Sequence, residues 1–313
     1  MLDGYAQAEK AVPSRLDRAE ADFWGQEHRL TKQLRRKVVH GDDLLYRFFQ
    51  DVLTKEPELF AKVPQMMLEA MGIWLPLDVY YDWPVLVPWV VRDPKCRGNP
   101  TKGIPDEWSS PDRRGYLRDD NSLIKALPRS LSVQTPNAGI LQGARMGSEF
   151  VASHVWREVL SRQTLASRVP LLNSFVPNLV WLPAQVAKLT DREGSVVQRT
   201  LQSMSFAIYH DAPVAPHLEG LVSEAWAMLP EPQSINVSIS NLNWFEPTDQ
   251  FFATRCQRLN TVVAALRLDA GQPLTTKVVT SRYTAGLPGV TRLARRELLA
   301  YLRRFQADRI ALD

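Results

Sequence analysis

The longest apolar run of the chain, residues 73–91, is rich in β-branched and aromatic residues but is repeatedly broken by proline and aspartate. The interrupting residues are Pro76, Asp78, Asp82, Pro84 and Pro88. A helix that spans a membrane needs about 20 consecutive apolar residues, and a charge within the bilayer is costly. The run therefore predicts no membrane segment. It indicates buried strands or a loop, with the prolines at edges or turns.

The composition predicts a protein that folds in a reducing compartment. With 313 residues, of which 45% are hydrophobic and 23% charged, the chain can bury a large core without disulfides or a structural metal. Its two cysteines, Cys96 and Cys256, belong to no CxxC pair, which excludes a zinc ribbon and a disulfide framework. Residues 1–18 lack the apolar centre of a secretory signal. We therefore expect a cytoplasmic protein.

Hydrophobic periodicity predicts an α+β fold. Apolar residues recur at helical spacing in residues 14–38, 44–53, 196–209, 217–229, 248–268 and 290–305. Strand patterns occur in residues 235–239 and 276–283. We expect a helical N-terminal part, a mixed α/β body and a helical C-terminal half. The predicted regions are residues 1–70 (helical), 71–135 (strands and a long loop), 136–210 (the candidate site) and 211–313 (C-terminal α/β).

Basic residues cluster locally although the net charge is small. A charge of +4, from 38 basic and 34 acidic side chains, is compatible with a polyanionic partner but does not by itself indicate nucleic-acid binding. The clusters are Arg35, Arg36 and Lys37, then Arg113 and Arg114, then Arg292, Arg295, Arg296, Arg303 and Arg304. The second cluster lies in residues 105–122, whose turn-forming residues are typical of a functional loop or of a surface insertion. Solvated helix faces are the alternative explanation for the clusters.

One segment places candidate catalytic residues in a useful order. The chain has no GxxxxGK[ST], GxGxxG, HExxH or GxSxG motif, so the common nucleotide-binding and serine-hydrolase chemistries are not indicated. In EFVASHVWRE, His154 lies within the strand-like residues 150–156. In VPNLVWLPAQVAKLTDREG, Asn178 opens a second strand-like segment, residues 178–182, and a helical pattern follows at residues 183–190. The predicted order is a strand with His, a loop, Asn, a strand and a helix.

This order resembles the ββα-metal core of the HNH, or His-Me finger, endonucleases, and HVW, NLVWLP and LTD resemble bacterial restriction-associated proteins of that type. The resemblance covers residues 145–194 and implies a ββα finger within residues 136–210. It also implies that His154 is the general base, because a neutral imidazole can take a proton from water near neutral pH. Asn178 would orient the imidazole by bridging the loop. A bound Mg²⁺ or Mn²⁺ would stabilise charge on the phosphate.

The metal-ligand positions depart from the pattern of that family. These nucleases usually place Asp or His immediately before the base, where this chain has Ser153, and His or Asn on the following helix, where it offers neither. Asp191, and Glu149 if the strand bends, are the candidate hard oxygen ligands. The resemblance therefore supports the ββα shape better than it supports metal-dependent cleavage.

Basic and aromatic side chains supply further candidate contacts. The candidate phosphate ligands are Arg145, Arg157, Arg162, Arg168 and Lys188, for which surface solubility is the alternative. The aromatic group comprises Trp74, Tyr80, Tyr81, Trp83 and Trp89. These rings would either stack on an exposed base or pack in the core.

The sequence thus predicts a DNA-directed HNH-type endonuclease of a restriction or defence system, with Mg²⁺ or Mn²⁺ as cofactor and double-stranded DNA as partner. A symmetric duplex target would favour a homodimer. Two alternatives stay open. One is a non-catalytic DNA-binding protein with a degenerate finger, and the other is a protein-interaction module in which the order of motifs is coincidental.

Overall fold

The computed structural model describes residues 55, 57–93, 96, 111–136, 141–161, 164–191, 193–268 and 287–306. Within these residues the fold is α+β, as predicted, with helices in the C-terminal part. The helices predicted at residues 14–38 and 44–53 and the strand predicted at residues 276–283 lie outside the described residues.

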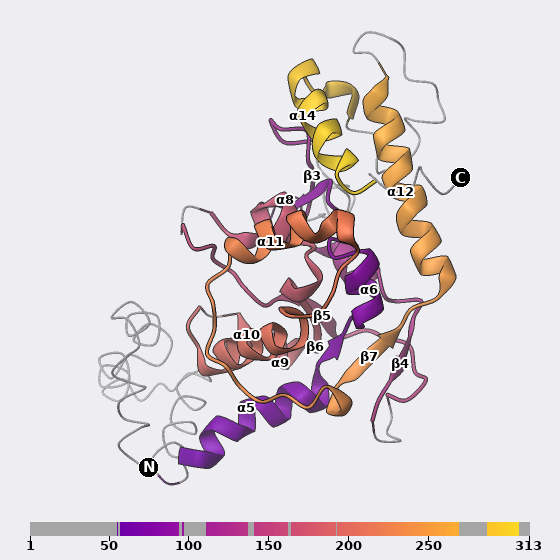
Figure 1. Ribbon diagram of the computed structural model, residues 1–313. Coiled ribbons are helices and arrows are strands. Elements are labelled where there is room, and N and C mark those ends of the chain that lie inside the picture. The colour runs from indigo at the N-terminus through magenta and orange to yellow at the C-terminus, as the bar shows by residue number, and fades with distance from the viewer. Residues whose placement is uncertain are drawn as a thin grey trace, which may run out of the picture.

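A five-stranded mixed sheet forms the centre of the fold (Figure 1). In spatial order its strands are β4 (Ser132–Gln134), β7 (Asn243–Glu246), β1 (Ile73–Trp74), β6 (Leu179–Pro183) and β5 (Phe150–His154). β1 and β7 run parallel, whereas the other neighbours are antiparallel. A separate parallel pair joins β2 (Val90–Arg92) to β3 (Leu117–Asp119). The sheet therefore brings together segments that are far apart in the sequence.

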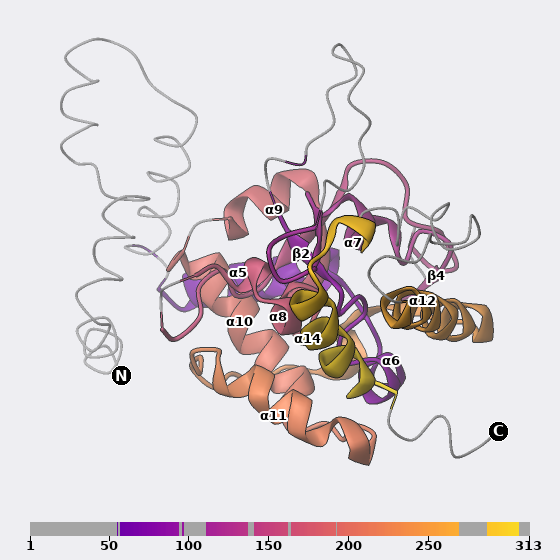
Figure 2. The same cartoon turned by 90° about the horizontal axis from the view of Figure 1, so that it is seen from above.

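The described helices pack around these strands (Figures 1 and 2). They are α5 (Pro57–Met71), α6 (Leu77–Asp82), α7 (Ser122–Ala126), α8 (Pro170–Asn173), α9 (Ala184–Thr190), α10 (Val196–Tyr209), α11 (Glu219–Ala227), α12 (Asp249–Arg267) and α14 (Arg292–Arg303). α9 contacts β5 and β6, and α10 contacts α9 and α5. α12 and α14 pack on each other, at the opposite end of the molecule from α5 (Figure 1). None of the described helices is both long and apolar enough to cross a membrane.

Side-chain caps fix the beginnings of α10, α12 and α14, three of the helices that periodicity predicted. The helix predicted at residues 196–209 is α10, and the Ser195 hydroxyl at its start accepts a hydrogen bond from the Gln198 amide. Thr248 caps α12 in the same way. Such caps satisfy amide groups that have no partner within the helix. The predicted helices at residues 217–229, 248–268 and 290–305 are also confirmed, as α11, α12 and α14.

Two expectations about strands need correction. The run at residues 73–91 contains β1 and the start of β2, but it also contains the helix α6, which was not predicted. The strand predicted at residues 235–239 is wrong, because these residues form no ladder and the strand β7 begins only at Asn243. Ile235 and Val237 do pack on the core. The alternation of apolar and polar residues therefore predicted which side chains face the core, but not whether the segment pairs with another strand.

The aromatic group of the apolar run lies in the core. Trp74, Tyr80, Trp83 and Trp89 are at most 2% exposed, and of the five rings only that of Tyr81 reaches solvent, at 41% exposure. Rings that are enclosed on all sides offer no face to an incoming base. The packing alternative is therefore confirmed for these four residues.

Candidate active site

The segment that carries His154 forms a strand–strand–helix unit. β5 and β6 pair antiparallel from Phe150 opposite Pro183 to His154 opposite Leu179. α9 follows β6 at once, and its first amide, that of Ala184, donates to the Glu149 carbonyl at 2.8 Å. This confirms the strands and the helix predicted for residues 150–156, 178–182 and 183–190, and it places His154 at the last position of β5.

The His154 imidazole is held from two sides. Its Nε2 lies 2.9 Å from the backbone oxygen of Asn173, and its Nδ1 lies 3.4 Å from Nδ2 of Asn121. A backbone carbonyl only accepts hydrogen bonds, so Nε2 must carry the proton. In the neutral ring the lone pair is therefore on Nδ1, which faces an amide donor. The ring has a defined tautomer and a defined basic atom.

The surroundings of His154 favour the neutral ring. Burial lowers the pKa of His154 to about 4, and the positive charges of Arg92 and Arg157 act in the same direction, whereas the hydrogen bond to Asn173 opposes them. The imidazole is therefore unprotonated at neutral pH. Its Nδ1 is a proton acceptor under the conditions in which most hydrolases work.

Asn178 bridges the loop that follows β5. Its side chain is fully buried, its Oδ1 accepts from the Trp156 amide at 2.7 Å, and its Nδ2 donates to the Leu172 carbonyl at 2.9 Å. These two bonds join the ends of the segment between Trp156 and Leu172. Asn173, the next residue, supplies the carbonyl that holds Nε2. Asn178 thus acts on the imidazole through the backbone rather than by direct contact, and its role in catalysis stays a prediction.

His154 lines a cleft of about 780 Å³ whose charged groups are mostly cationic. The cationic lining residues are Arg92, Lys125, Arg129 and Arg157, and the acidic ones are Asp120 and Asp191. Of the residues predicted from the sequence, His154, Arg157 and Asp191 therefore share one cleft. Guanidinium and ammonium groups beside a neutral imidazole suit an anionic substrate such as a phosphate ester.

The remaining predicted residues lie elsewhere. Arg145, Glu149, Arg168 and Lys188 are exposed and are not among the residues that line this cleft. Glu149 has a φ of +62°, so the chain turns sharply just before β5. Arg162 lies outside the described residues. Glu149, which the sequence suggested as a metal ligand, therefore does not line the cleft that contains His154 and Asp191.

Asn121 is a site residue that sequence analysis missed. It adopts the left-handed conformation, with a φ of 86°, which Asn tolerates better than most residues. The buried carboxylate of Asp119 builds this turn by accepting from the Ser122 hydroxyl at 2.8 Å and from the Leu123 amide at 2.9 Å. Asn121 Oδ1 is buried without a hydrogen-bond partner among the described residues. The turn-rich pattern of residues 105–122 was the available indication of a functional loop.

Two carboxylates of the cleft, those of Asp120 and Asp191, are candidate oxygen ligands for a divalent cation. Mg²⁺ is commonly bound through one or two carboxylates and completes its shell with water and substrate phosphate oxygens. In the part of the chain that the structure describes, no three His, Cys, Asp or Glu side chains gather into a closed metal cage.

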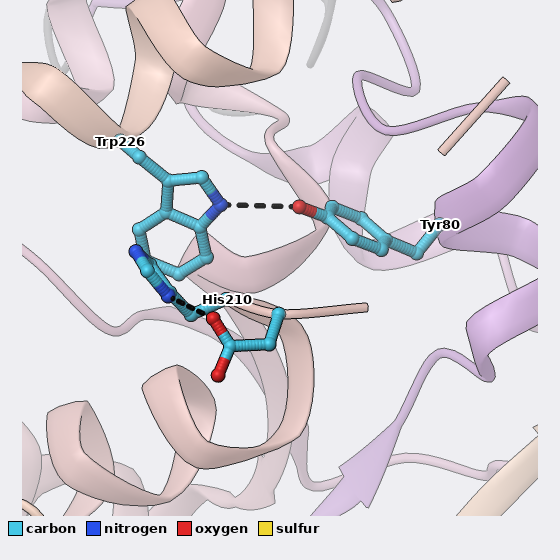
Figure 3. A network of polar contacts seen from close by, with 4 residues as sticks. Tyr80, His210 and Trp226 are labelled. Carbon is cyan, nitrogen blue, oxygen red and sulfur yellow. Dashed lines mark hydrogen bonds and ion pairs between the residues drawn. The ribbon is translucent and has the colours of Figure 1, made fainter. Parts of the chain in front are cut away.

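A second cleft, of about 860 Å³, contains another histidine. His210 Nδ1 lies 2.7 Å from Asp211 Oδ1, and the neighbouring Trp226 indole donates to the Tyr80 hydroxyl at 3.1 Å (Figure 3). The described residues that line this cleft include the carboxylates of Glu219 and Glu231 but no lysine or arginine. The His154 cleft is therefore better suited to an anionic substrate than the His210 cleft is.

No protein-family model matches the chain, and neither a curated protein nor a solved structure matches it. The chemistry of the His154 cleft is therefore derived from its own residues.

Proposed function

We propose that the chain is a DNA-directed phosphodiester hydrolase in which Nδ1 of His154 is the general base. One observation carries this proposal: the His154 imidazole, whose Nε2 is held by the Asn173 carbonyl, lines a cleft with four cationic side chains. The resemblance to HNH endonucleases supports the same reaction and suggests duplex DNA as the substrate and a restriction or defence role.

The proposed reaction begins with a water molecule that donates a hydrogen bond to Nδ1. The contact between Nδ1 and the Asn121 amide, at 3.4 Å, is long for a hydrogen bond, so water replaces a weak interaction. As the water oxygen attacks phosphorus, Nδ1 takes a proton from the water, and the bond from phosphorus to the leaving oxygen of the DNA strand breaks. The leaving oxygen takes a proton from solvent, and Nε2–H continues to donate to the Asn173 carbonyl. Arg92 and Arg157 are placed to contact phosphate oxygens.

A divalent cation would be held by the two carboxylates of the cleft. Asp120 and Asp191 would hold it, and when bound it would supply stabilisation of the negative charge on the phosphate and the leaving oxygen. The imidazole itself gains strength as a base from substrate binding. A bound phosphate anion favours the imidazolium ion, and so raises the low pKa of His154 toward the working pH.

The test compares cleavage by two histidine variants. Purified protein is incubated with labelled duplex DNA, with and without Mg²⁺ or Mn²⁺, and the products are separated on a gel. His154→Ala is expected to lower the cleavage rate by about 10²–10⁴-fold while DNA affinity changes little, because proton abstraction matters in the transition state. His210→Ala, which removes an exposed imidazole outside the cleft, is expected to keep the parent's rate.

Two results would contradict the assignment of His154. One is cleavage by His154→Ala at the parent's rate. The other is a large drop in melting temperature together with the loss of every activity, since this indicates a core histidine whose hydrogen-bond partners are left unsatisfied.

A non-catalytic DNA-binding protein is the second candidate function. Ser153 favours it, because this buried residue stands where the resembled family has a metal ligand, and its hydroxyl has no hydrogen-bond partner among the described residues. Binding that weakens with salt, with no cleavage under any metal condition, would select this alternative.

A further inference from the structure

Five exposed arginines at the α14 end of the molecule take no part in the His154 cleft. They are Arg113, Arg114, Arg292, Arg296 and Arg303, here called the distal arginine patch. Two other arginines of the same cluster have structural partners. Arg295 is buried and donates to the backbone oxygens of Leu268 and Leu287, and Arg304 pairs with Glu224 at 2.7 Å. Arg295 and Arg304 thus have structural roles and are not counted in the patch.

The two segments of the patch pack against each other. The turn that carries Arg113 and Arg114 reverses at Gly115, which has a φ of +88°. A Cβ atom built on Gly115 would lie 3.0 Å from Val290 Cγ1 and 3.5 Å from a methyl group of Leu298, on α14. The next residue, Tyr116, meets Tyr301 of α14 edge to face, with ring centroids 5.9 Å apart. The turn is therefore seated on α14.

The arginines of α14 share one exposed face. Arg292, Arg296 and Arg303 follow helical spacing, while the opposite face, with Leu298 and Leu302, is buried. None of the five side chains of the patch pairs with an acidic group within the described residues. Their charges are consequently available to an external anion. Glu297 is the exposed acid on this helix.

The patch and the cleft lie at the two ends of one short strand. The Gly115 turn leads directly into β3, and β3 leads to Asn121 in the cleft. In Figure 1, β3 lies beside α14. A three-residue strand spans roughly 10 Å, which is about the length of three base pairs of duplex. A single duplex is therefore long enough to reach both surfaces.

We propose that the distal arginine patch is a second nucleic-acid contact surface, which binds backbone phosphates of a duplex that extends beyond the His154 cleft. The proposal rests on the proposed function in that it takes the ligand of the cleft to be a nucleic acid. Guanidinium groups match phosphate oxygens and carry no base information, so this surface contributes affinity and register rather than sequence specificity.

The test is a binding experiment with the full chain and a long fluorescent duplex of about 30 base pairs, without divalent metal, over a range of salt. The patch variant is Arg292→Glu with Arg296→Glu. The matched control is Lys55→Glu with Lys62→Glu, which reverses two exposed charges, that of Lys62 being on α5 at the opposite end of the molecule from α14. Glutamate at the first residue of α14 is compatible with the helix dipole, so we expect the variant to fold.

We expect the patch variant to bind the long duplex at least about tenfold more weakly at low salt. Because each lost phosphate contact changes the slope of log K against log salt by about 0.9, we expect the slope to fall by about 2. The control variant should differ little from the parent in both measurements.

Equal affinity and equal slope for patch variant and parent would overturn the proposal. So would an effect of the patch that appears only on phosphatidylserine vesicles, because the anion would then be a lipid surface. Failure of the proposed function is distinguishable. If the parent never cleaves DNA but binds the long duplex through the patch, the proposed hydrolase activity is wrong and the patch proposal stands. If the parent cleaves DNA and the patch variant binds the duplex as tightly as the parent, the patch proposal is wrong and the hydrolase proposal stands.

Discussion

Replacing Asn178 by alanine tests whether the loop after β5 depends on one buried side chain. The change removes both bonds of the bridge, to the Trp156 amide and to the Leu172 carbonyl. The Leu172 carbonyl keeps a partner, since the Phe175 amide also approaches it at 3.4 Å. The Trp156 amide is left buried without an acceptor, which destabilises the fold by about 1–3 kcal/mol. Loss of the second hydrogen bond destabilises it by about 1 kcal/mol more. We expect the free energy of unfolding to fall by about 2–4 kcal/mol.

Urea denaturation of the parent and of two variants measures this effect. Asn173→Ala is the comparison variant, because it removes the bond from Nδ2 to the Val90 carbonyl and a side-chain interaction with His154, but leaves the backbone oxygen that holds the imidazole in place. We expect it to cost about 1–2 kcal/mol. A loss below about 1 kcal/mol for Asn178→Ala, or a loss no greater than that of the comparison variant, would refute the reasoning that the bridge holds the loop.

Two further perturbations test the site and the patch. Since the pKa of His154 is lowered from 6.5 to about 4, its contribution to stability is fully present above pH 6.5 and is lost as the pH falls toward 4. The value of kcat/KM for cleavage should accordingly be level from about pH 6 to about pH 8 and decline below about pH 5. A decline of kcat/KM centred near pH 6.5, or an NMR titration of the His154 imidazole centred there, would contradict the lowered pKa of this ring. Gly115→Ala should lower stability by about 1–2 kcal/mol, because a side chain at a positive φ is strained and its Cβ would press on Val290. Gly143→Ala is the control, because Gly143 has a similar φ of +69° but no atoms within 4 Å of a Cβ built there. Equal melting temperatures for the two variants would show that close packing of residue 115 on Val290 and Leu298 does not contribute to the loss of stability.

The elements that could be predicted from the sequence are those fixed by local patterns. The periodicity of residues 196–209 matches α10 residue for residue, and the order of strands and helix around His154 is found as expected. Both depend on neighbouring residues and on caps such as Ser195. By contrast, the alternation of apolar and polar residues in 235–239 predicted only which side chains face the core. The strand forms instead at Asn243, where β1 is available as a pairing partner.

The rest of the site could not be predicted because its parts come from remote segments. Arg92 and Asn121 reach His154 through the β2–β3 pair and the turn before α7, and no pattern around His154 encodes that meeting. The exposed arginines near His154 appeared equivalent in the sequence. Of the arginines that the structure describes there, Arg157 lines the cleft, whereas Arg145 and Arg168 do not, although all three are exposed.

The parallel pairing of β1 with β7 has a consequence for the order in which the chain folds. The hairpin of β5 and β6 can form once residue 183 has been synthesised, but β1 and β4 find their shared neighbour only when β7, some sixty residues later, becomes available. Until then one edge of β1 is unpaired, and unpaired edges recruit other chains. A fragment of the chain that contains β1 but ends before β7 therefore exposes a sheet edge, and we expect it to aggregate more readily than the full chain.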